Sequence, residues 1–154
     1  MFNIVLFEPE IPPNTGNIIR LCANTGVKLH LIHPLGFDMN EKSLRRAGLD
    51  YIDQSMIHHY ENYQDYLEKQ ASDSLYAIST KGTQHYSDCK FNKNDSFIFG
   101  PETRGLPKYM LGQFDTNKIL RILMLKNSRS LNLSNAASII IYEAWRHNNF
   151  TILS

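Results

Sequence analysis

Short apolar runs alternate with amphipathic segments along the chain, a pattern typical of strands that alternate with helices. The apolar runs predict strands over residues 2–8, 28–33, 75–79, 96–99 and 119–124. The segments between and after them predict helices over residues 14–25, 41–47, 60–70, 108–113 and 132–147. This order predicts an α/β fold, in which a mainly parallel sheet carries helices on both faces.

The ends of the predicted elements carry local signals. Asn14 or Thr15 is expected to cap the first helix, because either side chain can accept hydrogen bonds from backbone N–H groups. Gly26 and Gly48 are expected to end the first and second helices. The prolines within residues 8–13 predict a stiff loop before the first helix.

The composition is that of an ordinary globular protein. The chain has 154 residues, which fits one domain over 1–154, and 42% of them are apolar and 20% charged. The net charge of +1 does not by itself indicate nucleic-acid binding. Cys22 and Cys89 lie far apart, which favours neither a disulfide framework nor a zinc site. Without a membrane-length apolar run or a signal-peptide pattern, the sequence indicates a cytoplasmic protein with no membrane contact.

Three polar sequences follow predicted strands, at residues 9–17, 100–107 and 125–132. Ligands of parallel α/β sheets bind beyond the carboxyl ends of the strands, so these sequences are the candidate site. The chain has no G-x-G-x-x-G after the first strand, no Walker A sequence and no G-x-S-x-G. His58 and His59 are adjacent and point to opposite faces of an extended chain, so we expect structural or solvent-facing roles for them.

The first polar sequence leads into a helix on which Asn17, Arg20 and Asn24 share one stripe. Near a helix N-terminus, such a stripe predicts a grip on a phosphate or a ribose phosphate. A capped surface helix would explain the same residues.

The second sequence, residues 99–107, contains two glycines and two prolines, which fix an unusual backbone path. Gly100 would let a ligand approach the main chain, and Glu102 could accept hydrogen bonds from it, although a plain surface turn is the alternative. In the third sequence, Ser130, Asn132 and Ser134 could cap the last helix or face a ligand.

The last helix is apolar around most of its girth. One face carries Leu133, Ala136, Ala137, Ile140, Ile141 and Ala144, and Ile139, Tyr142 and Trp145 widen it. Burial inside the monomer and burial against a second copy would both explain this face.

In order and spacing, residues 8–20, 99–107 and 130–136 resemble the three motifs of the SPOUT class of RNA methyltransferases. The likeness covers nearly the whole chain and is close to the short TrmL and YibK type, which methylates the wobble nucleotide of tRNA. It implies a SPOUT α/β knot, a deep trefoil near the C-terminus, and a homodimer. It implies S-adenosyl-L-methionine as methyl donor, S-adenosyl-L-homocysteine as product, and no metal. The implied substrate is the ribose 2′-OH of nucleotide 34, a cytidine or modified uridine, in leucine tRNA.

The resemblance also implies roles for individual residues. The catalytic set is Arg20, Asn14 and Asn17, and the cofactor-binding set is Ile78, Gly100, Glu102, Ile122, Ser130, Leu131 and Asn132. Candidates for contacts with the tRNA backbone are Arg104, Lys108, Arg121, Lys126, Arg129 and Arg146. A guanidinium stays charged in proteins, so Arg20 is better suited to hold a phosphate and stabilise a forming alkoxide than to take a proton. Two alternatives share this fold: 2′-O-methylation of rRNA or of another tRNA position, and RNA binding without catalysis.

Overall fold

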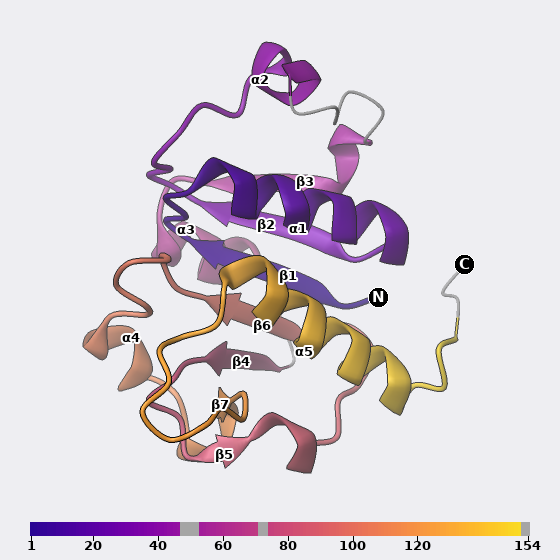
Figure 1. Ribbon diagram of the computed structural model, residues 1–154. Coiled ribbons are helices and arrows are strands. Elements are labelled where there is room, and N and C mark those ends of the chain that lie inside the picture. The colour runs from indigo at the N-terminus through magenta and orange to yellow at the C-terminus, as the bar shows by residue number, and fades with distance from the viewer. Residues whose placement is uncertain (47–52, 71–73, 152–154) are drawn as a thin grey trace.

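A computed structural model describes residues 1–46, 53–70 and 74–151 (Figure 1). The strands are β1 (Asn3–Phe7), β2 (Lys28–Ile32), β3 (Ile57–Tyr60), β4 (Leu75–Ile78), β5 (Gln84–His85), β6 (Ser96–Phe99) and β7 (Ile119–Arg121). The α-helices are α1 (Pro12–Thr25), α2 (Glu41–Arg46), α3 (Tyr63–Lys69), α4 (Lys108–Leu111) and α5 (Leu133–His147). No helix among these residues is both long enough and apolar enough to cross a membrane.

The strands form one sheet in the order β3-β2-β1-β6-β4-β7-β5. Every strand pair recorded within the described residues is parallel, so the predicted parallel α/β sheet is confirmed. Their carboxyl ends therefore meet at one edge of the sheet, which is where the three polar sequences begin.

Helices cover both faces of this sheet, as the alternating pattern predicted. α1 and α5 lie side by side across one face (Figure 1) and contact each other. Ile4 and Leu6 of β1 pack in the core on that side. The alternate residues, Val5 and Phe7, pack in a second core with side chains of α3 and α4. The central strands are buried on both faces, which explains their short and continuous apolar runs.

The first helix starts earlier than predicted. It begins at Pro12 with Ile11 in the N-cap position, and no side chain of its own caps it. Asn14 and Thr15 therefore lie buried inside the first turn, and the prediction that either one is the cap is wrong. The physical reason is that Pro12 and Pro13 suit the first helical positions, where proline needs no N–H partner. Gly26 ends the helix in the left-handed conformation with φ of 74°, as predicted.

Two strands were not predicted. β3 occupies residues that lack a clear apolar run, and the predicted helix over 60–70 begins only at Tyr63. β5 has two residues, too few for a pattern. β7 ends at Arg121, so the predicted strand over 119–124 is too long. Gly48, the predicted end of the second helix, lies outside the described residues.

The central face of α5 is buried within the monomer. Leu133, Ala136, Ala137, Ile140, Ile141 and Ala144 belong to the core that α5 shares with α1 and the sheet. Ile139 and Trp145 are partly buried against that core, whereas Tyr142 is 46% exposed. The monomer interior therefore explains most of the apolar stripe, and Tyr142 remains available to a partner.

Candidate functional site

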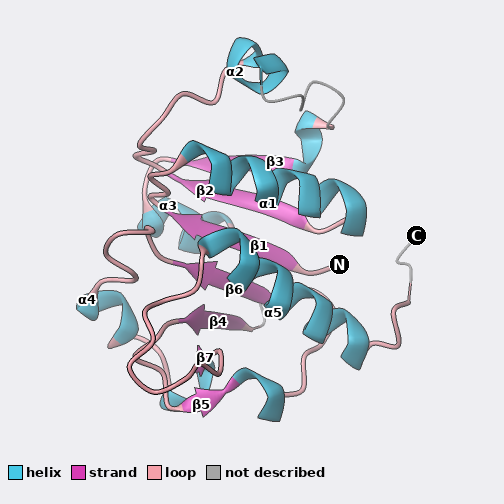
Figure 2. Ribbon diagram, viewed as in Figure 1, coloured by secondary structure: helices cyan, strands magenta, loops and turns pink. Residues whose placement is uncertain are grey.

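A cavity of about 450 Å³ lies where the loops after β4, β6 and β7 meet the N-terminal ends of α1 and α5. Figure 2 shows these loops gathered at the end of the sheet to which the strand arrows point. The walls are apolar at Ile78, Ile122 and Leu133, and polar at Asn14, Glu102 and other residues of the loops. Its volume is in the range of sites for small molecules and cofactors.

The loop after β6 is tied to the loop before α1 by a reciprocal pair of acidic side chains. The Glu102 carboxylate accepts hydrogen bonds from the backbone N–H groups of Glu10 at 2.7 Å and Ile11 at 3.2 Å. In return, the Glu10 carboxylate accepts from the Thr103 backbone N–H at 3.1 Å and from the Thr103 hydroxyl at 2.7 Å. Glu102 thus supplies, from a distant part of the chain, an acceptor for the N-cap residue Ile11 and for the residue before it.

Charge reinforces this clamp. The Thr103 hydroxyl, then its backbone N–H, and further the Arg104 guanidinium lower the pKa of Glu10 below its ordinary value. Arg104 lies 4.0 Å from Glu10 and 3.7 Å from Glu8, between carboxylate oxygens and guanidinium nitrogens. Both pairs are solvent-exposed enough to contribute little stability, so the hydrogen bonds carry the clamp.

Gly100 is required by the packing of its own loop. A Cβ atom at this position would lie 2.2 Å from the backbone atoms Gly105 C and Leu106 N. This close approach is made by the chain's own loop, so Gly100 has a packing role, and its predicted contact with a ligand stays a prediction. Gly105 turns the same loop with φ of +68°.

Asn132 joins the third motif to the first. Its Oδ1 atom accepts hydrogen bonds from the Ser134 backbone N–H at 3.0 Å, the Ser134 hydroxyl at 2.6 Å and the Asn135 backbone N–H at 3.3 Å. Its Nδ2 atom donates to Asn14 Oδ1 at 2.9 Å. Asn132 is therefore the cap of α5, one of three predicted candidates, and also holds the amide of Asn14.

The structure brings most of the predicted site together. All seven residues predicted to bind the cofactor line the cavity, and so does Asn14. Asn17 and Arg20 do not line it; both are exposed along α1. Arg20 lies in the middle of α1, and the anion grip that its stripe predicts near the helix N-terminus stays a prediction.

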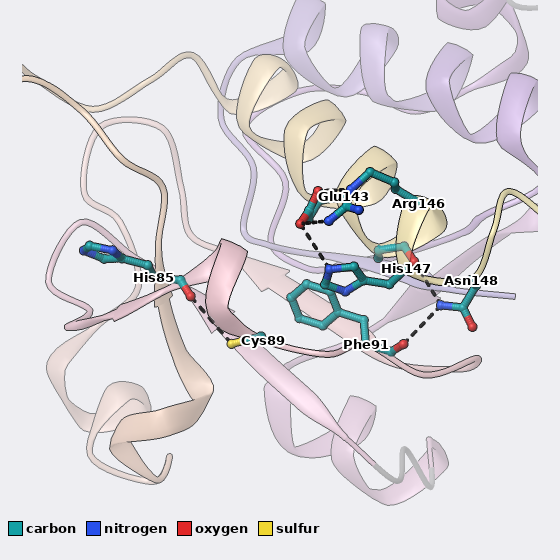
Figure 3. A network of polar contacts seen from close by, with 8 residues as sticks. His85, Cys89, Phe91, Glu143, Arg146, His147 and Asn148 are labelled. Carbon is teal, nitrogen blue, oxygen red and sulfur yellow. Dashed lines mark hydrogen bonds and ion pairs between the residues drawn. The ribbon is translucent and has the colours of Figure 1, made fainter.

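The predicted RNA-contacting residues fall into two groups. Arg104, Lys108, Arg121, Lys126 and Arg129 are exposed on the elements and loops at the carboxyl edge of the sheet. Arg146 instead lies in the last turn of α5, about 20 Å along the helix from Asn132. Figure 3 shows its guanidinium against Glu143, to which Arg146 donates hydrogen bonds at 3.0 and 2.9 Å. Arg146 is thus distant from the other five.

Three polar lining residues lie outside the three motifs and were missed. Ser79, Thr80 and Lys81 follow β4 and line the cavity opposite the second motif. The signal for them was weak, because a short polar turn after a strand occurs in most proteins. Glu10 and Thr103 lie inside the motifs, but no sequence pattern predicts a contact between residues 93 positions apart.

The histidines near β2 and β3 form pairs with a structural role. His30 stacks on His58 at 5.1 Å between ring centroids, and His33 shares a hydrogen bond of 2.8 Å with His59. Burial, and then the neighbouring His58 and Lys28, lower the pKa of His30 to about 4. Within the described residues, no cluster of three or more metal-ligating side chains occurs. Cys22 and Cys89 are free thiols.

The comparisons with known proteins agree with this geometry. The model of the SpoU rRNA Methylase family matches residues 1–142. The chain belongs to the SpoU rRNA methylase family. One member, a tRNA (cytidine(34)-2′-O)-methyltransferase of Saccharophagus degradans, is 57% identical over 97% of each chain.

Two solved structures share this architecture. One, from a study of the 2-OH methylation of C/U34 on tRNA, has a TM-score of 0.89 and 38% identity, and 98% of each chain is covered. Another, an AdoMet-bound rRNA methyltransferase of Sinorhizobium meliloti, has a TM-score of 0.78 and 25% identity, over 99% of this chain and 57% of that one. The family resemblance expected from the three motifs is confirmed.

Proposed function

We propose that this SpoU methylase transfers a methyl group from S-adenosyl-L-methionine to the ribose 2′-oxygen of nucleotide 34 in tRNA. The products are the 2′-O-methyl ribose, S-adenosyl-L-homocysteine and the proton of the hydroxyl, which passes to the solvent. The observation that carries the proposal is the cavity, which joins all three motifs at the carboxyl edge of the sheet. The identity of 57% to a relative named for cytidine 34 of tRNA favours this nucleotide over other RNA positions. Leucine tRNAs, with cytidine or a modified uridine at position 34, are the expected isoacceptors.

The cavity suits the proposed cofactor. It has apolar surface at Ile78, Ile122 and Leu133 for a flat base, and polar loop residues for the charged amino-acid end. Ser130 and Leu131, on the loop before α5, complete this wall. Bound S-adenosyl-L-methionine supplies an electrophilic methyl group, and no metal is needed for that chemistry.

Residues of the chain must hold the ribose and stabilise the negative charge that forms on its 2′-oxygen. Preorganised donors and a nearby positive charge are the strongest means of doing this. Asn14 provides an amide at the cavity, and Arg20 provides the charge. Alignment of the reacting groups can contribute roughly 7–11 kcal/mol in ideal cases.

A homodimer would complete this site. Arg20 is exposed and does not line the cavity of its own copy. Exposed apolar side chains also surround the paired helices α1 and α5: Ile11 is 40% exposed, Leu131 38%, Tyr142 46% and Phe150 51%. We propose that a second copy covers this surface and brings Arg20 of the partner subunit to the cavity.

Three further features belong to the same proposal. The whole chain acts as one catalytic domain, because all seven strands share a sheet. The trefoil knot is expected where the chain runs from β7 to α5 and passes the loops after β4 and β6. The cytoplasm, which holds the tRNA, is the expected compartment.

Transfer of label from S-adenosyl-L-methionine to tRNA, followed by mapping of the methylated nucleotide, tests the function. Methylation at the ribose of nucleotide 34 supports it. Label in rRNA or at another tRNA position would favour the alternative specificity, and binding of RNA without transfer would indicate a non-catalytic protein.

A further inference from the structure

We propose that Asn132 is a positioning residue that turns the amide N–H of Asn14 toward the ribose 2′-oxygen. The inference rests on the proposed function and assigns Asn132 a role other than the cofactor contact expected from the motif. It starts from the single hydrogen bond that joins the two amides, from Asn132 Nδ2 to Asn14 Oδ1, at 2.9 Å.

The first step is that the orientation of the Asn132 amide is fixed by α5. Its oxygen faces three donors, which are the backbone N–H groups of Ser134 and Asn135 and the Ser134 hydroxyl. An amide nitrogen in that place would face the two N–H donors, and only the Ser134 hydroxyl oxygen could accept one of its hydrogens. The Oδ1 atom of Asn132 must therefore face α5, and its Nδ2 atom must face Asn14.

The second step carries this orientation to Asn14. Because Asn132 presents a donor, Asn14 must present its oxygen, and its Nδ2 atom is turned the other way. Asn14 is only 6% exposed, and it lines the cavity. Within the part of the chain that the structure describes, Asn14 Nδ2 has no hydrogen-bond partner, and it is absent from the fully buried atoms that lack one. An accessible N–H donor is thus held at the cavity.

The third step is the chemistry that such a donor can perform. The ribose hydroxyl gains negative charge on its oxygen as its proton leaves, and a fixed N–H donor stabilises that charge more than it stabilises the neutral hydroxyl. An amide held with its oxygen toward the cavity would instead repel the charge. The capping bonds of α5 therefore decide whether Asn14 helps or hinders the reaction.

The test uses Asn132→Asp and Asn14→Ala in the full-length protein. The carboxylate introduced by Asn132→Asp still caps α5, because its oxygens accept from the same donors. It offers no donor to Asn14, whose amide is expected to turn over and present its oxygen to the cavity. We expect kcat for tRNA methylation to fall about 100-fold or more in each single variant. The Kd of S-adenosyl-L-methionine, measured by calorimetry, should stay within about twofold of wild type.

The double variant separates positioning from mere structure. If Asn132 acts through Asn14, then Asn132→Asp changes kcat by less than about twofold once Asn14 is alanine. Asn62→Asp is the matched control, because Asn62 caps α3 in the same way and lies outside the cavity lining. It should leave kcat unchanged.

Two results would overturn the inference while leaving the proposed function intact. One is a kcat loss from Asn132→Asp that persists in the Asn14→Ala background. The other is a cofactor Kd that weakens in step with kcat, which would make the two residues cofactor contacts. A wild-type protein that binds S-adenosyl-L-methionine but methylates no tRNA would instead overturn the proposed function, and this inference with it.

Discussion

The substitution Gly100→Ala should damage both the fold and the cavity. The added Cβ atom would lie 2.2 Å from two backbone atoms, Gly105 C and Leu106 N. Ordinary van der Waals contact begins near 3.4 Å, so the loop backbone at Gly100 and at Gly105 must separate by about 1 Å. Backbone cannot yield as a flexible side chain does, and we expect a loss of about 3 kcal/mol or more in the free energy of unfolding.

Two other glycines provide graded controls for the same substitution. Gly105→Ala meets nothing within 4 Å, but its φ of +68° should cost about 1 kcal/mol. Gly112→Ala meets only the Lys108 and Tyr109 carbonyl oxygens at 3.5 and 3.7 Å, and its φ is −65°. It should be neutral or stabilising by about 0.5 kcal/mol.

Urea unfolding of the three variants, with calorimetric titration of S-adenosyl-L-methionine, tests this order. Gly100→Ala should be the least stable and should bind the cofactor at least about tenfold more weakly, because its loop lines the cavity. Equal stability of the Gly100 and Gly112 variants would refute the packing role assigned to Gly100.

Four further predictions concern charge and hydrogen bonding. Arg20→Ala should abolish methyl transfer while S-adenosyl-L-methionine still binds; near-normal turnover would remove Arg20 from the mechanism. Glu102→Ala should destabilise the protein by about 2 kcal/mol, since the two N–H groups of the residues just before α1 lose their acceptor, and an unchanged urea midpoint would contradict the clamp. The folded-state pKa of His30, about 4, lies below its unfolded value. The contribution of His30 to the free energy of unfolding is therefore fully present above about pH 6.5, and about 3 kcal/mol of it is lost as the pH drops to 4. An NMR titration of His30 near pH 6.5 would disprove this. Lys126→Ala should lower the slope of log affinity for tRNA against log salt by about 1; an unchanged slope would exclude a phosphate contact.

Much of the sheet was predictable because its central strands are buried on both faces. β1 and β6 are apolar after their first residue and buried along almost their whole length, and β4 is apolar throughout. β2 is apolar from Leu29 to Ile32 except at His30. β3 escaped prediction because half of it is histidine. Its place in the sheet depends on pairing with β2 and on the stacking of His58 against His30, neither of which a local pattern records.

The position of the site was predictable from the sequence, but the contacts that its residues make were not. Strand-end loops with glycine, proline and small polar residues marked the cavity correctly. The clamp, however, joins Glu102 to Glu10 across 92 positions, and the amide pair joins Asn132 to Asn14 across 118. A local sequence pattern predicts that the nearest polar side chain caps a helix. Before α1, the acceptor is instead Glu102, which comes from another loop.

The central claim is that the three motifs form one site for ribose methylation of tRNA. It is tested most directly by incubating the protein with tRNA and S-adenosyl-L-methionine labelled at the methyl group, then mapping the label by mass spectrometry of nuclease fragments. The account predicts a single 2′-O-methyl ribose at nucleotide 34, lost in Arg20→Ala. Label on a base, or at any other nucleotide, would contradict it.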